Sequence, residues 1–250
     1  MDDNDFSTLY SRQLPVYGEE GQKKLKEATV LIVGCGGLGS SVSTILSRSG
    51  VGHLVLVDDD IVSISNIHRQ FLYTHADVGN NKCECAAVSP LLCLSKNTPV
   101  CIHATASEIG QLIAQYKPTV VMDCTDNFAV RYAINTACVE ANLPMVYGSV
   151  TREEGQISVF YHNSEYPTCP CFECIHPEKP KQMDRPPPVI PAICSFVATI
   201  QAQQAISLII GVGDILIGQM ATVNLFKLKI RQYKLKERDP KCKTCGVIEE

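Results

Sequence analysis

The hydrophobic pattern of the chain alternates between strand-like and helix-like segments. Thr29–Val33 and His53–Val57 are short apolar runs of the kind that form buried parallel strands, and apolar residues recur at helical spacing across 38–48 between them. Strand, glycine-rich turn, helix and strand in this order make one βαβ unit, whose connection is right-handed in nearly all proteins. The pattern therefore predicts a parallel sheet that begins near residue 29.

The same alternation continues along the chain. Further helices are predicted across 83–94, 109–116, 129–141 and 193–210. Further strands are predicted across 100–104, 119–123, 145–147, 156–161 and 222–235, with a turn at Gly155. The predicted fold class is α/β, a Rossmann-type doubly wound and mostly parallel sheet with C-terminal antiparallel strands.

The domain organisation follows from the absence of repeats and linkers. A single domain is predicted for 1–250, with residues 1–27 as an N-terminal helical arm. Residues 163–191 are rich in proline, cysteine and charge, and they predict a flexible crossover loop. Because loops of this length are usually functional, we expect 175–191 to become ordered over a bound partner.

Composition and charge exclude several classes of function. The hydrophobic content of 45% is sufficient for a large core, and the net charge of −4 shows no basic surplus for nucleic acid. The N-terminal residues are acidic and lack the basic and apolar regions of a secretory signal, so a cytoplasmic location is expected. No apolar run reaches the roughly 20 residues of a membrane span, so no membrane partner is expected.

The first candidate site is the glycine-rich turn GCGGLG after Thr29–Val33. Its glycines are Gly34, Gly36, Gly37 and Gly39. They let the backbone approach a phosphate at the N-terminus of the next helix, where unpaired N–H groups and a partial positive charge favour anions. A turn that only permits tight packing is the alternative, and the turn by itself does not separate NAD from ATP.

Acidic and basic residues further along the chain favour ATP. Asp58, Asp59 and Asp60 end the second predicted strand, where a carboxylate binds ribose hydroxyls in such folds. Arg69, in the segment SNIHRQ, and Lys82 are two fixed cations, which suit a triphosphate better than the pyrophosphate of NAD. Ordinary surface cations are the alternative for this segment.

The segment DCTDN follows the predicted strand across 119–123. Ligands of open α/β sheets bind at this end of the strands, so Asp126 is a candidate for holding Mg²⁺ and Asn127 for binding the cofactor. The alternative is that Asp126 or Asn127 caps the next helix.

Two C-x-x-C pairs predict a zinc site. Cys171 with Cys174 and Cys242 with Cys245 supply four thiolates for a closed tetrahedral centre. A redox pair would lie at a strand-to-helix junction, whereas these lie in loops. Cys169 and His176 flank the first pair as alternative ligands. Most other cysteines, such as Cys93, Cys101, Cys124 and Cys138, are expected to be small buried apolar residues.

Taken together, GCGGLG, VDDDIVSISNIHRQ, DCTDN and the two C-x-x-C pairs resemble the MoeB/ThiF family of the ubiquitin-activating-enzyme superfamily, from Tyr10 to Cys245. The resemblance implies a homodimer in which ATP and Mg²⁺ adenylate the terminal Gly-Gly carboxylate of a small ubiquitin-like β-grasp sulfur carrier, similar to MoaD or ThiS. The expected cofactors are ATP, Mg²⁺ and Zn²⁺.

The resemblance also assigns roles to residues. It implies that Asp58, with Asp60 beside it, holds the ribose and that Asp126 binds Mg²⁺. The residues implied to hold the phosphates are Asn66, Arg69, Gln70 and Lys82, with Arg12 reaching in from the neighbouring subunit. No side-chain base is required, because a carboxylate is already ionised at neutral pH.

One position departs from the family pattern. Several members carry a cysteine in the loop after the first C-x-x-C, where this chain has Asp184. Cys194 lies in an apolar stretch that begins a helix, so a buried and inert thiol is expected. We therefore expect adenylation without a covalent acyl or sulfur step on that cysteine, and an acyl-thioester on Cys194 would contradict this.

Three other functions fit part of the pattern. A NAD-dependent oxidoreductase shares the glycine turn and the ribose acid but does not need Arg69, Lys82, Asp126 and the cysteine pairs together. A non-catalytic module that binds nucleotide or a ubiquitin-like protein has no need of those charged residues. A dehydratase acting on a modified tRNA base uses ATP on this fold but is disfavoured by the cysteine pairs and the lack of basic surplus.

Overall fold

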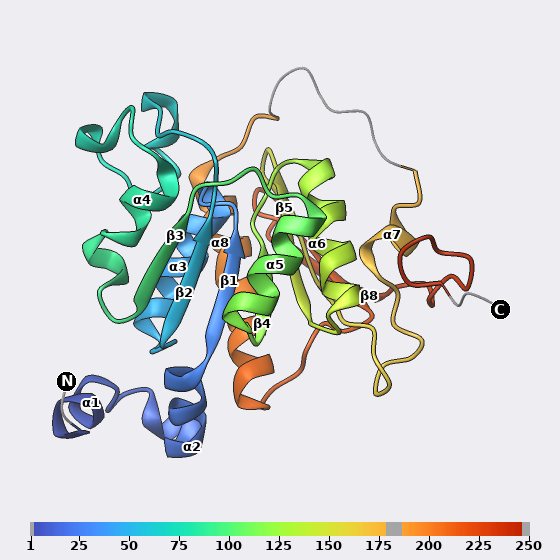
Figure 1. Cartoon of the computed structure of the whole chain (residues 1–250), viewed down its shortest axis with the longest axis horizontal. Helices are drawn as coiled ribbons and strands as arrows, with labels where there is room; N and C mark the ends of the chain where they lie inside the picture. The colour runs from blue at the N-terminus through green and yellow to red at the C-terminus, as the bar shows by residue number, and fades with distance from the viewer. Residues whose placement is uncertain (1–2, 179–186, 247–250) are drawn as a thin grey trace.

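The computed structural model describes residues 3–178 and 187–246, and its core is one eight-stranded sheet (Figure 1). The strand order is β3-β2-β1-β4-β5-β6-β7-β8. The strands are β1 (Thr29–Val33), β2 (His53–Val57), β3 (Lys96–Val100), β4 (Val120–Asp123), β5 (Met145–Thr151), β6 (Glu154–Phe160), β7 (Gln219–Asn224) and β8 (Lys229–Lys234). Neighbours from β3 to β5 are parallel and those from β5 to β8 antiparallel, which confirms the predicted fold class.

Helices cover both faces of the parallel half (Figure 1). They are α1 (Asp3–Leu9), α2 (Leu14–Glu27), α3 (Gly37–Arg48), α4 (Lys82–Ala87), α5 (Ala106–Tyr116), α6 (Phe128–Glu140), α7 (Phe172–Ile175) and α8 (Pro191–Ile210). Successive side chains of a strand point to opposite faces, so Ile32 joins the core beneath α3 and α8 while Leu31 joins the core beneath α5 and α6.

Helix α8 is the apolar centre of the core on the α3 side of the sheet. Within the described ranges it alone has the length and mean hydropathy, 1.6, of a membrane span, but 67% of that stretch is buried inside the fold. It contacts α2, α3, β5 and β6. A helix that is apolar around its circumference and surrounded by protein is a core helix.

Two element predictions fail near the sheet edge. The predicted strand across 100–104 is wrong, because β3 occupies Lys96–Val100, a polar segment that includes Pro99. An edge strand tolerates proline and lacks the continuous apolar run of a central strand. The predicted helix across 83–94 ends at Ala87, and a separate 3₁₀ turn, Pro90–Leu92, begins where the Ser89 side chain accepts the Leu91 N–H.

The antiparallel half also differs in detail. The predicted strand across 222–235 is two strands, because Leu228 has a φ of 48° in the turn between β7 and β8. The turn predicted at Gly155 lies earlier, at Arg152, whose φ is 53°. Residues 163–191 contain α7, and residues 179–186 lie outside the described part of the chain.

Candidate functional site

A cavity of about 570 Å³ opens at the carboxyl ends of the parallel strands. It lies after β1, β2 and β4, where open α/β sheets bind their ligands. The predicted site residues that line it are Gly34, Gly36, Gly37, Asp58, Asp60, Asn66, Arg69, Gln70, Lys82, Asp126 and Asn127. Segments that are far apart in the sequence therefore meet in one place, as the motifs require.

Two positions of the glycine turn, Gly34 and Gly39, have no space for a side chain. Gly34 has a φ of 93°, and a Cβ there would lie 2.7 Å from the carbonyl oxygen of Cys124. Gly39 does not line the cavity; a Cβ at this position would overlap the Gly34 carbonyl oxygen. Gly39 thus allows α3 to pack closely on the turn, which places the N-terminus of α3 at the cavity.

Asp58 is held by backbone groups at the end of β2. Its carboxylate accepts the Cys35 N–H at 2.6 Å and the Asp60 N–H at 2.8 Å. Burial nevertheless raises the pKa of Asp58, because the desolvation of its carboxylate outweighs these bonds and the nearby Lys82 charge. Lys82 pairs with Asp60 at 2.7 Å, and its own side chain is only 7% exposed.

The segment after β2 presents a free cation and a buried amide to the cavity. Arg69 donates to the Ser65 carbonyl at 2.7 Å and has no ion-pair partner among the described residues. The side-chain oxygen of buried Gln70 has no hydrogen-bond partner in the described structure. Buried polar groups are normally satisfied, so the unsatisfied Gln70 oxygen beside a guanidinium without an ion-pair partner indicates a place for a ligand. The Asn66 side chain accepts the Ser63 N–H and fixes this segment.

Of the two neighbours Asp126 and Asn127, only Asn127 caps the next helix. Asn127 caps α6, because its side-chain oxygen accepts the Ala129 N–H at 2.8 Å. Asp126 is exposed at the cavity, with no hydrogen bond or ion pair to its carboxylate among the described residues. Asp126 is therefore a carboxylate of the cavity wall that remains available to a cation.

Arg131 belongs to none of the sequence motifs, yet it lines the same cavity from α6. Its guanidinium bonds the buried Asp123 carboxylate at 2.8 Å and the Thr125 carbonyl at 2.6 Å. Rings of Phe128, Tyr147 and Phe172 surround it at 4.9–5.8 Å. An arginine flanked by Val130 and Tyr132 inside a predicted helix was the signal that could have identified it.

Arg12 lies far from the cavity of its own chain. It is exposed in the connection between α1 and α2. This connection contacts the C-terminal end of α3, because the Gln13 side chain donates to the Ser49 carbonyl at 2.8 Å. The other end of α3 borders the cavity, and a helix of 12 residues is about 18 Å long. The structure therefore does not bring Arg12 together with the other candidate residues.

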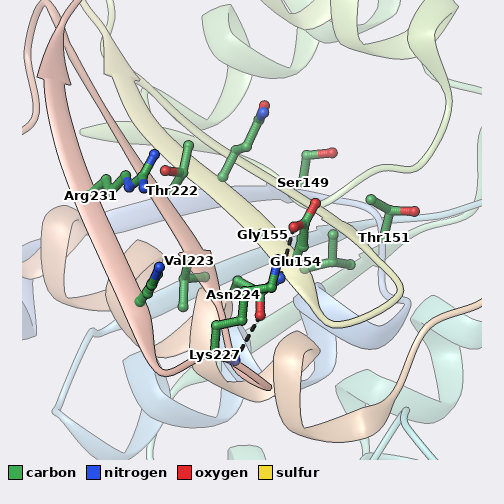
Figure 2. Close-up of a pocket in the computed structure, with 12 residues that line it drawn as sticks. Ser149, Thr151, Glu154, Gly155, Thr222, Val223, Asn224, Lys227 and Arg231 are labelled. Atoms are coloured by element: carbon green, nitrogen blue, oxygen red, sulfur yellow. Dashed lines mark hydrogen bonds between the residues drawn. The ribbon is translucent and has the colours of Figure 1, made fainter.

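A second hollow, of about 440 Å³, lies on the antiparallel strands (Figure 2). Residues of β5, β6, β7 and β8 line it, with Lys227 in the turn before β8. Ser149, Val150 and Thr151 line both hollows, so the second hollow adjoins the first cavity at the end of β5.

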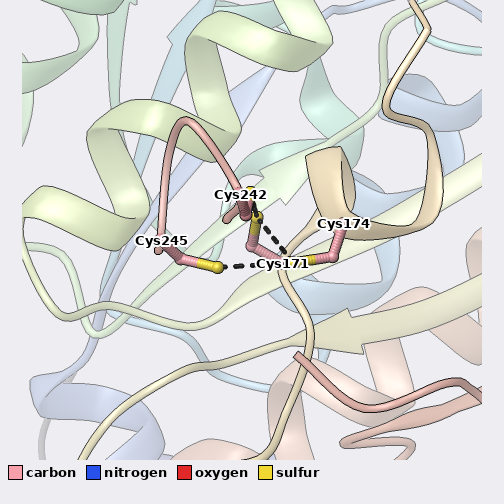
Figure 3. Close-up of side chains that lie close together, drawn as sticks. All are labelled: Cys171, Cys174, Cys242 and Cys245. Atoms are coloured by element: carbon pink, nitrogen blue, oxygen red, sulfur yellow. Dashed lines mark hydrogen bonds between the residues drawn. The ribbon is translucent and has the colours of Figure 1, made fainter. Parts of the chain in front are cut away.

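The four predicted cysteines converge into one cluster (Figure 3). The sulfur of Cys171 lies 3.9 Å from that of Cys174 and 3.6 Å from that of Cys242, and the Cys174 and Cys245 sulfurs are 3.4 Å apart. A tetrahedral zinc with bonds of about 2.3 Å separates its sulfurs by about 3.8 Å, so the cluster fits this metal. Cys169 and His176 are not part of the cluster.

The cysteine cluster is connected to the cavity wall. Asn135 on α6 donates to the Cys171 sulfur at 3.6 Å and accepts the Phe172 N–H at 2.8 Å. Arg131 is one turn earlier on the same face of α6. The cysteine cluster and the cavity thus share one helix.

The remaining cysteines were predicted with mixed success. Cys124, Cys138 and Cys194 are buried as expected, whereas Cys93 and Cys101 are exposed, contrary to expectation. Burial raises the pKa of Cys194, which keeps this cavity-lining thiol protonated. Asp184 lies outside the described residues.

Comparison with known proteins gives a consistent result. The model of the ThiF family matches residues 10–244. The chain is 38% identical over 244 residues to adenylyltransferase and sulfurtransferase MOCS3 of Caenorhabditis briggsae, covering 95% of this chain and 60% of that protein. It is 36% identical over 246 residues to adenylyltransferase and sulfurtransferase MOCS3-1 of Zea mays, covering 95% and 51%. The structure of E. coli MccB with ATP superposes with a TM-score of 0.79 at 25% identity, covering 95% of this chain and 73% of that one.

Proposed function

The chain belongs to the ThiF family, and we propose that it is an ATP-dependent adenylyltransferase acting on the C-terminal Gly-Gly carboxylate of a small ubiquitin-like β-grasp sulfur carrier. The observation that carries this proposal is the single cavity in which the glycine turn, Asp58, Arg69, Lys82 and Asp126 meet. The relatives named adenylyltransferase and the ATP-bound MccB structure support the same chemistry.

The residues act by positioning and by charge. A carboxylate oxygen of the carrier attacks the α-phosphorus of ATP, the bond to the bridging oxygen breaks, and pyrophosphate leaves. Arg69 and Lys82, which line the cavity, would stabilise the charge that develops on the phosphate oxygens, and Asp58 would hold the ribose. Mg²⁺, held by Asp126, would neutralise the phosphates when bound.

We further propose a zinc-containing homodimer that works in the cytoplasm. None of the thirteen cysteines, all within the described residues, forms a disulfide, which agrees with a reducing compartment. The exposed Arg12 is too far from its own cavity, and a second copy of the chain would supply it from the neighbouring subunit.

Adenylation is tested by ATP–pyrophosphate exchange with Mg²⁺ and a panel of small β-grasp proteins that end in Gly-Gly. We expect one carrier to support exchange, and Asp126→Ala to lower it about 100-fold, as removal of one charge-stabilising group does. Asp214→Ala, at an exposed aspartate outside the cavity, should leave exchange unchanged. ATP binding without exchange for every carrier would instead support a binding module, and NAD binding an oxidoreductase.

The place of Arg12 is tested by mixing inactive variants. Arg12→Ala should lower exchange about 100-fold, because one phosphate-binding cation is lost. Subunits carrying Arg12→Ala, mixed with subunits carrying Asp126→Ala, should regain about a quarter of wild-type exchange, since half the dimers are mixed and each has one complete cavity. Activity that stays at the level of the single variants would show that Arg12 does not act across subunits.

A further inference from the structure

The second hollow is lined mostly by polar side chains and adjoins the proposed adenylation site. Cross-strand pairing aligns its side chains in two rows across β5, β6, β7 and β8. One row is Ser149, Gln156, Thr222 and Arg231; the other is Thr151, Glu154, Asn224 and Lys229. We call these eight residues the polar platform.

The platform faces away from α8. A Cβ on Gly155 would lie 2.3 Å from a methyl carbon of Val197 in α8, so Gly155 faces that helix and its neighbours Glu154 and Gln156 face the other side. Figure 2 labels six residues of this open face, Ser149, Thr151, Glu154, Thr222, Asn224 and Arg231, along the antiparallel strands.

Positive charge is concentrated at the β8 end. Lys227, Lys229 and Arg231 line the hollow, are exposed, and form no ion pair in the part of the chain that the structure describes. Residues 227–236 include five cations and no acid, although the whole chain has a net charge of −4. The acid in the hollow, Glu154, accepts the Asn224 side-chain N–H at 2.8 Å.

We propose that the polar platform binds an acidic segment of the carrier just upstream of its Gly-Gly end, with Lys229 and Arg231 as specificity-determining residues. This inference rests on the proposed function, which places the carrier's terminal carboxylate in the adjoining cavity. Strands about 4.8 Å apart put β8 about 14 Å from β5, the span of about four extended residues. Acidic side chains at least that far before the carboxyl terminus therefore reach the β8 cations.

The shape and composition of the hollow favour a peptide over a single-stranded nucleic acid. Proteins that bind single strands stack bases on aromatic side chains, and the described residues lining this hollow include none. They instead offer hydroxyl and amide groups from Ser149, Thr151, Gln156 and Thr222, which suit peptide backbone.

Binding is tested with fluorescein-labelled synthetic peptides that end in Gly-Gly and carry two glutamates, two lysines or two serines upstream. Fluorescence anisotropy on the zinc-loaded wild type should show about tenfold tighter binding of the glutamate than the lysine peptide, with a smaller preference at high salt. The double variant Lys229→Glu/Arg231→Glu should reverse the preference. Lys234→Glu is the matched control, because Lys234 is on the same strand but points to the opposite face.

Several results would overturn the inference. They are equal binding of the three peptides, no binding of any, an equal effect of Lys234→Glu, and tighter binding of a single-stranded RNA oligonucleotide than of the glutamate peptide. The pyrophosphate-exchange assay with Asp126→Ala tests adenylation independently. Charge-dependent peptide binding without exchange would reject the adenylation proposal and support peptide binding by the polar platform. Pyrophosphate exchange together with equal binding of the three peptides would support adenylation and reject the proposed role of the polar platform.

Discussion

Arg131→Met is expected to lower the free energy of unfolding by about 3–5 kcal/mol, because it leaves the buried Asp123 carboxylate without its ion-pair partner. The side chains of Arg131 and Asp123 are 4% and 0% exposed, and they meet at 2.8 Å. For a chain of this size the loss corresponds to a melting temperature about 10 °C lower. Thermal melting and urea denaturation measure it.

A double variant separates the uncompensated charge from simple loss of contacts. Arg131→Met/Asp123→Leu should be at least as stable as Arg131→Met, since removing both charges removes the desolvation cost. Arg48→Met is the control, because Arg48 is exposed and also donates to backbone carbonyls, at 2.9 and 3.0 Å. A loss below about 1 kcal/mol for Arg131→Met would show that water or rearrangement compensates Asp123.

The central sheet could be predicted from the sequence because burial on both faces leaves a continuous apolar run. Thr29–Val33 and His53–Val57 have the predicted bounds for this reason. The edge strand β3 was misplaced, since one neighbouring strand and partial exposure allow Lys96 and Pro99 within it. The turn inside 222–235 was missed because alternating residues continue through it and no glycine marks it.

The cavity was predicted in large part because each motif is local to one strand end. Strand ends of a parallel sheet lie along one edge, so Gly34, Asp58 and Asp126 had to converge once the strands were placed. Arg131 was missed because its role depends on Asp123 eight residues earlier and on rings from three segments. The polar platform depends on strand register, which spacing along the chain does not reveal.

Removal of the proposed zinc is expected to cost about 5 kcal/mol or more, a part of the roughly 10–16 kcal/mol that structural zinc supplies in small zinc domains. Cys245→Ser removes one of the four sulfurs and should abolish zinc content, measured by mass spectrometry of the metal. Cys169→Ser is the matched control, because Cys169 is also buried in the loop that carries Cys171 but lies outside the cluster. It should retain the metal and nearly all of the stability.

Loss of the proposed zinc should also affect the proposed nucleotide cavity. The Phe172 N–H and the Cys171 sulfur both bond Asn135, and the Phe172 ring lies 5.8 Å from the Arg131 guanidinium. Without the metal, Cys171 and Cys174 no longer hold α7 in place, and Arg131 loses its contact with the Phe172 ring. We therefore expect Cys245→Ser to lower exchange activity and increase hydrogen exchange in α7 and the N-terminal half of α6. Full zinc content, or zinc loss with unchanged protection in α6, would show that the cysteine cluster does not support the cavity.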